Sequence, residues 1–164
     1  NESAFEIFDR MREEKVQPNA ATFISVLSVC SHTGQVDKGW QVFRMMSKDY
    51  GLKPKPEHIG CMVDLLGRSG QLGEARELIQ ELSHPSASVF ASLLGACKYH
   101  LDSEVGEEMA MKLAELEPEN PTPLVILSNL YAEFGRWGDV ERIRGIMNNK
   151  GLRKLPGSSL IGEM

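Results

Sequence analysis

The stretch CMVDLLGRSGQLGEAREL, residues 61–78, contains the pattern that decides the fold of this chain. Apolar residues recur at helical spacing on both sides of Gly70, so the stretch predicts two helices joined by a glycine turn. The same pattern returns every 31 to 36 residues along the whole chain. The turn positions of the four copies are Gly34, Gly70, Leu101 and Gly135.

At three positions that follow each turn residue, the four copies carry similar side chains. The fifth is mostly small, which we attribute to close approach of the two helices of one hairpin, and the eighth and twelfth are apolar. The fifth positions are Gly39, Ala75, Gly106 and Val140; the eighth are Val42, Leu78, Met109 and Ile143; the twelfth are Met46, Leu82, Leu113 and Met147; Ala4, Ile7 and Met11 are in step before them. Such self-similarity predicts an all-α, right-handed α-solenoid of stacked helix-turn-helix repeats, which favours a binding protein over an enzyme.

The ends of the expected helices follow from capping signals. The second helices are predicted at 36–48 and 72–82, with Ser103 as the N-cap of the next one and Gly151 at the C-terminal end of the last. Residues 1–19 form a lone second helix, whose exposed apolar face allows end-to-end self-association. The tail 152–164 breaks the pattern, and we expect it to fold back on the last hairpin as an extended strand.

Charge limits the kind of partner. The 164 residues carry a net charge of −5, and 41% of them are hydrophobic. The net charge is +1 over residues 1–55, −3 over 56–86, −5 over 87–120 and +2 over 121–164. A duplex-DNA binder that relies on phosphate contacts should be basic, so any nucleic acid bound here must be gripped mainly through its bases. No apolar run approaches the ~18 residues of a membrane span, so no membrane contact is expected.

Several residues that carry chemistry elsewhere are expected to be structural here. Cys30, Cys61 and Cys97 show no CxxC spacing, which favours buried reduced thiols and a reducing compartment. Trp40 and Trp137 are expected to pack rather than to serve as stacking platforms. The chain contains no His-x-Glu, and its four histidines are expected at polar surface or groove positions rather than as metal ligands. We therefore expect no catalytic residue, metal or cofactor.

Six strings in this order resemble the pentatricopeptide repeat family of land plants: residues 23–32, 61–68, 93–97, 115–118, 127–131 and 156–159. The resemblance covers essentially the whole chain and is greatest with the C-terminal end of the subclass that alternates motifs of standard, long and short length. It implies that 1–19 is the second half of a standard motif, 20–55 a long motif, 56–86 a short motif, and 87–120 and 121–164 two tetratricopeptide-like extension motifs, the second with the C-terminal tail.

By that resemblance, the chain belongs to a recognition factor for cytidine-to-uridine editing of chloroplast or mitochondrial transcripts. In the family, the fifth and last residues of a motif choose a base of single-stranded RNA. Carried over, these are Ile24 with Lys55 in the long motif, Gly60 with Ser86 in the short motif, and Asn19 alone. The pairs with Ile24 and Gly60 lack the usual polar partners, so these motifs either read weakly or act as spacers.

The implied location is a plant organelle, with the transit peptide outside this chain. Deamination would come from a cytidine deaminase domain beyond Met164 or from another protein of the editing complex. A second interpretation stays open, in which the repeats are a protein–protein interaction scaffold without RNA readout. The acidic segment 87–120 suits a protein partner better than RNA under either interpretation.

Overall fold

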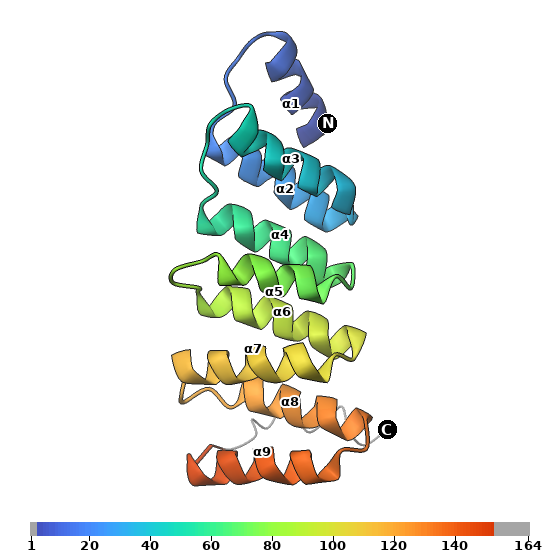
Figure 1. Cartoon of the computed structure of the whole chain (residues 1–164), viewed down its shortest axis with the longest axis vertical. Coiled ribbons are helices and arrows are strands. Elements are labelled where there is room, and N and C mark those ends of the chain that lie inside the picture. Colours follow the sequence, from blue (N-terminus) through green and yellow to red (C-terminus); the bar gives the residue numbers. More distant parts are fainter. Residues whose placement is uncertain (1–2, 153–164) are drawn as a thin grey trace. The chain divides into compact units, whose positions relative to one another are not determined.

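The structure is a computed structural model that describes residues 3–152, and the regular structure in that range is entirely α-helical (Figure 1). The helices are α1 (Ala4–Glu13), α2 (Ala20–Thr33), α3 (Val36–Lys48), α4 (Pro56–Arg68), α5 (Leu72–Gln80), α6 (Ala87–His100), α7 (Ser103–Leu116), α8 (Thr122–Glu133) and α9 (Trp137–Asn149). The predicted helix 36–48 coincides with α3, and α5 ends two residues before its predicted end.

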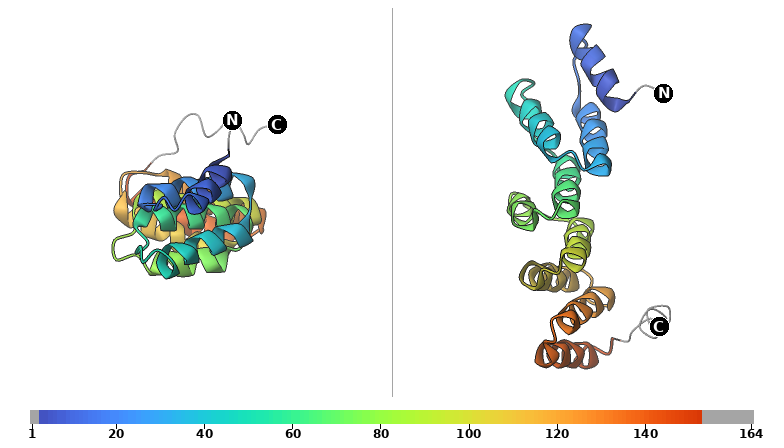
Figure 2. Two further views of the ribbon diagram at one scale, coloured as in Figure 1. Left: turned by 90° about the horizontal axis from the view of Figure 1, so that it is seen from above. Right: turned by 90° about the vertical axis from the view of Figure 1, so that its right-hand side faces the viewer.

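The chain divides into two compact units, Asn1–Pro85 and Ser86–Met164. In the first unit α2 packs against α1, α3 and α4, and α4 packs against α5. In the second unit α6 contacts α7 and α8, and α8 contacts α9. Within each unit the first helices of successive hairpins therefore lie side by side, as α2 and α4 do in Figure 2. The predicted all-α solenoid class is confirmed.

Each hairpin turns at a residue with left-handed backbone conformation. The φ angle is 67° at Gly34, 80° at Gly70, 54° at Leu101 and 67° at Gly135. The next amide then donates back to a carbonyl near the end of the first helix, as Gln35 does to Cys30 at 3.0 Å. This bond satisfies one of the carbonyls that a helix end leaves unpaired. The turn residue is therefore the fixed point of the repeat, and leucine replaces glycine there once.

The small fifth position is required mainly by the next hairpin. A Cβ added at Gly106 would lie 2.8 Å from Leu130 Cδ2 on α8 and 3.4 Å from Cys97 Cβ on α6. At Gly39, the side chain that an added Cβ would meet first is that of Leu65 on α4. Both leucines are buried in a close-packed interior, so a shift of either side chain would also displace its neighbours. The expectation that small residues serve the packing of one hairpin is therefore incomplete, because the tightest contact lies between hairpins.

The N-cap of α7 differs from the sequence prediction. Asp102, not Ser103, is the cap, because the Asp102 carboxylate accepts a hydrogen bond from the Val105 amide at 3.0 Å. Aspartate is as good an N-cap as serine, and the helix begins one residue earlier than the serine signal suggested. At the end of α9, Gly151 has φ 68° and the cap position is confirmed.

The first helix, α1, has an exposed apolar position, as predicted. The Ile7 side chain is 41% exposed, although the residues at the same phase of the later repeats are buried: Val42, Leu78, Met109 and Ile143. The adjacent residue, Phe8, anchors α1, because its ring is buried and packs edge-on against Phe23 at 5.5 Å between centroids. The expected fold-back of the C-terminal tail concerns residues 153–164, which lie outside the described part of the chain.

Cysteine and tryptophan burial agrees with the sequence prediction only in part. Cys30 and Cys97 are buried free thiols, and burial raises the pKa of Cys97 to about 12. Cys61 is half-buried rather than buried. Trp40 is half-buried and packs edge-on against Phe43 at 6.0 Å. Trp137 is 64% exposed, so its assignment as a packing residue is wrong; as the first residue of α9 it lies at the turn edge of its hairpin.

Candidate nucleic-acid interface

Three of the five candidate RNA-binding residues directly precede a first helix. Asn19 is the N-cap of α2, Lys55 of α4 and Ser86 of α6, and all three are exposed. The amide groups and dipole of a helix N-terminus carry partial positive charge, which favours electron-rich groups of a ligand. The structure places Asn19 and Lys55 in the same unit, whereas Ser86 begins the second.

Asn19 has a side-chain amide with a fixed orientation. Its Oδ1 accepts hydrogen bonds from the Thr22 amide at 3.0 Å and from Thr22 Oγ1 at 3.1 Å. Thr22 Oγ1 in turn accepts from the Asn19 amide at 3.2 Å, which completes a capping box. With its oxygen engaged in the cap, Asn19 offers a ligand the two N–H donors of its Nδ2. The side chain therefore presents donors, not acceptors, at the start of α2.

Lys55 and the start of α2 are connected through His58, which is fully buried at the third position of α4. The Lys55 amide donates to His58 Nδ1 at 3.1 Å, and His58 Nε2 lies 2.9 Å from the Ala20 carbonyl oxygen. An acceptor at Nδ1 requires the proton on Nε2, where it is donated to Ala20. The expectation that this histidine occupies a polar surface or groove is wrong, because two backbone groups hold it in the interior.

The fifth-position residues Ile24 and Gly60 lie on the neighbouring first helices α2 and α4. Ile24 is half-buried and offers an apolar edge. A Cβ added at Gly60 would meet nothing within 4 Å, so the helix surface there is open. Neither side chain can form a hydrogen bond, and any contact that they make with a base is limited to packing.

Ser86 does not use its side chain as a cap. Its Oγ lies 2.9 Å from Ser88 Oγ, and no side-chain hydrogen bond caps the first turn of α6. Either hydroxyl can donate in that pair, so Ser86 has no fixed donor or acceptor character. Of the five candidate residues, Asn19 is the one whose polar group is oriented by the fold.

A series of interacting polar side chains on α2 and α4 was not predicted from the sequence. Ser31 Oγ donates to an oxygen of Asp64, and Arg68 Nε lies 3.1 Å from the other oxygen of the same carboxylate. The spacing of four residues between Asp64 and Arg68 was a usable signal for this ion pair. Pairing neutralises the one acidic side chain in the later part of α4, which lowers the repulsion that a phosphate would meet there.

The second unit has a larger charged network around Tyr131 on α8. The Tyr131 hydroxyl donates to the Glu107 carboxylate on α7, and Arg142 Nη2 on α9 lies 3.0 Å from Glu107 Oε1 and 3.2 Å from Asp139 Oδ1. Arg136 pairs with Asp139 at 2.8 Å, and its guanidinium lies 4.5 Å from the centre of the Tyr131 ring. Burial and the bond to Glu107 raise the pKa of Tyr131 to about 12.

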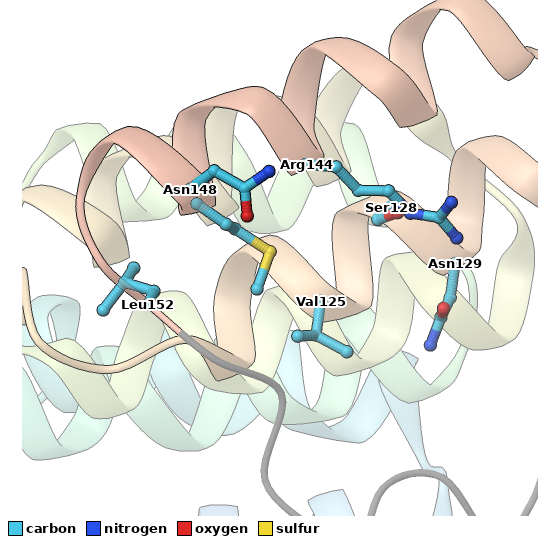
Figure 3. A pocket seen from close by; sticks show the side chains of 7 residues that line it. Val125, Ser128, Asn129, Arg144, Asn148 and Leu152 are labelled. Atoms are coloured by element: carbon cyan, nitrogen blue, oxygen red, sulfur yellow. The ribbon is translucent and has the colours of Figure 1, made fainter.

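A half-open groove of about 330 Å³ runs between α8 and α9 in the second unit (Figure 3). Its lining is mixed, with polar groups from Ser128, Asn129, Arg144 and Asn148 and apolar groups from Val125, Met147 and Leu152. Among residues 3–152, no group of three or more His, Cys, Asp or Glu side chains could hold a metal ion. In the same range no helix is long and apolar enough to cross a membrane.

Family models match both halves of the chain. The model described as the pentacotripeptide-repeat region of PRORP matches residues 1–89, and the model of the E motif matches residues 100–162. The chain belongs to the pentatricopeptide repeat family. The repeat-region model covers the hairpins of the first unit, and the E-motif model covers α7, α8 and α9 of the second.

Relatives in Arabidopsis thaliana support the same assignment. One pentatricopeptide repeat-containing protein is 63% identical over 161 residues, covering 98% of this chain and 26% of the relative. A second, named chloroplastic, is 47% identical over 98% of this chain and 22% of its own length. A third, named mitochondrial, is 45% identical over 96% of this chain and 28% of its own length. The chain thus spans about a quarter of the length of these relatives.

Solved structures with the same fold include two pentatricopeptide repeat proteins. The maize protein PPR10 superposes with a TM-score of 0.71 at 21% identity, over 91% of this chain and 22% of PPR10. The repeat domain of Arabidopsis thaliana protein-only RNase P 1, solved in complex with tRNA, gives a TM-score of 0.75 at 15% identity, over 96% of this chain and 86% of that domain. At these identities the similarity establishes the fold.

Proposed function

We propose that this chain is part of a site-recognition factor for cytidine-to-uridine editing of organellar transcripts. Residues 1–86, comprising half a standard motif, a long motif (20–55) and a short motif (56–86), bind single-stranded RNA. The extension motifs 87–120 and 121–164 link to a cytidine deaminase or recruit it, and the chain itself carries no catalytic residue. The succession of a repeat region by an E motif supports this division, as do relatives named chloroplastic or mitochondrial.

The observation that carries RNA reading is the oriented amide of Asn19. The ring nitrogen on the Watson–Crick edge is an acceptor in adenine and cytosine, and a donor in guanine and uracil. Because Asn19 presents only N–H donors, it can pair with the ring nitrogen of adenine and cytosine but not with that of guanine and uracil. PPR10, which shares this fold, has also been solved with an 18-nt RNA element. Together these points favour RNA over other ligands for the first unit.

The substitution Asn19→Asp tests this proposal. Aspartate caps a helix as well as asparagine does, so one oxygen keeps the bonds to Thr22 and α2 stays intact. The other oxygen becomes an acceptor in place of the Nδ2 donors. We expect the preference at one RNA position to move from adenine or cytosine to guanine or uracil, by about 5- to 10-fold in affinity for one exchanged hydrogen bond.

The measurement is equilibrium binding of the full-length protein to single-stranded RNAs that differ at one position. Asn19→Ser is the matched control, since serine also caps the helix but presents no amide; it should lose the preference without acquiring a new one. Equal affinities for all four bases at every position in the wild-type protein would exclude base reading by Asn19.

A protein-binding role is a second candidate, and it is favoured by one feature of the second unit. Segment 87–120 carries seven acidic and two basic side chains, and Tyr99 and Trp137 are 82% and 64% exposed in that unit. Acidic surface repels RNA, whereas exposed aromatic side chains are enriched at protein interfaces. If this is the function of the whole chain, residues 1–120 will bind RNA no better than an unrelated acidic protein does.

A further inference from the structure

We propose that His58 is a positioning residue that sets the distance between two neighbouring RNA-contacting positions, Asn19 and Lys55. This inference rests on the proposed function of the first unit. His58 touches neither a base nor the RNA backbone; it acts through the two helix N-termini that it holds. The role follows from where its two hydrogen bonds end.

One hydrogen bond of the imidazole ends at a candidate RNA-contacting position, and the other ends at the residue next to such a position. His58 Nδ1 accepts from the amide of Lys55 itself, at 3.1 Å. His58 Nε2 donates at 2.9 Å to the carbonyl of Ala20, the residue that directly follows Asn19. One rigid ring therefore spans the N-terminus of α2 and the N-terminus of α4. The separation of the two caps is determined by the width of the ring and two hydrogen bonds.

Burial of the ring keeps the distance between the two caps constant. His58 is fully buried, and its neighbours on α4, Ile59 and Met62, are buried as well. A buried polar group without a partner is costly, so neither bond is readily exchanged for water. Because the imidazole also has no rotatable bond between its two nitrogens, the ring resists changes in length better than two flexible side chains would.

The corresponding positions of the second unit lack such a connection. The third residue of α6 is Val89 and the third residue of α8 is Leu124, and both are buried apolar side chains. Neither can form a hydrogen bond to a neighbouring helix start. The imidazole bridge therefore belongs to the unit that we propose to contact RNA, where the spacing of consecutive bases has to match the spacing of consecutive caps.

The test compares two polar replacements in the full-length protein. His58→Gln has an amide oxygen that can accept from the Lys55 amide, as a glutamine at the third position of a capping box does, and an amide nitrogen that can donate to Ala20, so both partners can be retained. His58→Asn is shorter by one methylene and reaches only one of them. Short single-stranded RNAs, first selected for binding to the wild-type protein, are then varied at the position that responds to Asn19→Asp and at its two neighbours.

We expect His58→Gln to keep the wild-type base preferences and His58→Asn to lose them by about 5-fold at those positions, the effect of roughly one hydrogen bond. Leu66→Ala is the control for destabilisation, because Leu66 is fully buried on α4 but away from its N-terminus. It should lower the Tm at least as much as His58→Asn while it leaves the base preferences unchanged. If His58→Asn does not fold, His58→Leu replaces it with the same expectation.

Two results would overturn the inference. In the first, His58→Asn and Leu66→Ala both weaken binding equally for all bases, which would make His58 a support of the fold and nothing more. In the second, His58→Gln loses base preference as fully as His58→Asn does, so that the two hydrogen bonds do not determine spacing. A wild-type protein that shows no base preference at any position would overturn the proposed function itself, and this inference with it.

Discussion

The two units join successive hairpins by different physical means. In the first unit, α2 and α4 meet through buried apolar side chains, the buried imidazole of His58, and the contact from Ser31 to Asp64, which pairs with Arg68. In the second unit, α7, α8 and α9 are connected by the network of Tyr131, Glu107, Arg142 and Asp139, whose charged members are partly exposed. Both units also depend on a glycine, Gly39 or Gly106, against a leucine of the next hairpin.

This difference determines which unit keeps its hairpin contacts when a polyanion such as RNA binds. Phosphate groups compete for arginine side chains, and salt screens exposed ion pairs. A junction built on Arg142 and Arg136 is therefore open to disturbance by RNA, whereas the part of the first junction that His58 forms is buried and is not. The arrangement favours RNA contact at the first unit and leaves the second for a partner that does not compete for its arginines.

The largest expected effect comes from filling the space at the two glycines. Gly39→Val and Gly106→Val should each lower the free energy of unfolding by about 3 kcal/mol, because the added carbons overlap buried leucines of the next hairpin. Urea unfolding measures the change. If the hairpins approach equally closely in the two units, the two variants will lose similar amounts of free energy of unfolding.

The control for these variants is an exposed helical glycine in each unit. A Cβ at Gly73 or Gly138 would meet nothing within 4 Å. Gly73→Ala should therefore raise the free energy of unfolding by about 0.5–1 kcal/mol through helix propensity alone, and Gly138→Ala should act in the same direction. A valine at Gly39 or Gly106 that behaves like these alanines would show that the hairpins do not approach as closely as the structure has them.

The repeat period predicted the fold because each phase has one physical cause. Turn residues at 34, 70, 101 and 135 all adopt the left-handed conformation, and the residues eight positions later form the core in every complete hairpin. The small fifth position was recognised together with its contact inside the hairpin, but its tighter contact with the next hairpin was not. Periodicity shows that a position is crowded; it does not show whether the crowding comes from the same hairpin or from the next.

The second largest effect concerns the charged junction alone. Tyr131→Phe removes the hydroxyl that donates to Glu107 and should lower the free energy of unfolding by about 1 kcal/mol at neutral pH. His58 and the first unit should be unaffected. Thermal unfolding of the variant measures the loss of stability. A loss of the same size in high salt would indicate that the hydroxyl contributes more to stability than the arginines around it.

The same residue gives a pH dependence with a definite sign. The pKa of Tyr131 is raised from 10.0 to about 12 in the folded protein, so the folded state holds this proton more tightly than the unfolded state does. The corresponding stabilisation is complete below pH 10 and disappears as the pH rises toward 12. Tyr131→Phe should remove this part of the alkaline loss of stability; if the profiles of the two proteins coincide between pH 10 and 12, the shift is absent.

The candidate site was less predictable than the fold. Asn19 could be named from the sequence, but the direction of its amide depends on the hydroxyl and amide of Thr22, which only the capping geometry shows. His58 was assigned to a surface because a single histidine has no periodic signal, and its partners are backbone groups 3 and 38 residues away. Backbone partners leave no trace in side-chain patterns, so a bridge of this kind is visible only in three dimensions.

The smallest effect compares the hairpin turns of the two units. The first unit turns at Gly34 and Gly70, whereas the first hairpin of the second unit turns at Leu101 with φ 54° and a half-exposed side chain. A left-handed backbone costs a leucine about 1–2 kcal/mol, and glycine relieves this cost but loses more entropy on folding. Leu101→Gly should therefore raise the free energy of unfolding by about 0.5 kcal/mol, measured by urea unfolding.

Gly34→Ala, which imposes the same strain on the first unit, should lower the free energy of unfolding by about 1 kcal/mol. A decrease on Leu101→Gly would mean that the exposed leucine contributes contacts that outweigh its backbone strain, and the turns of the two units would then differ in packing as well as in conformation.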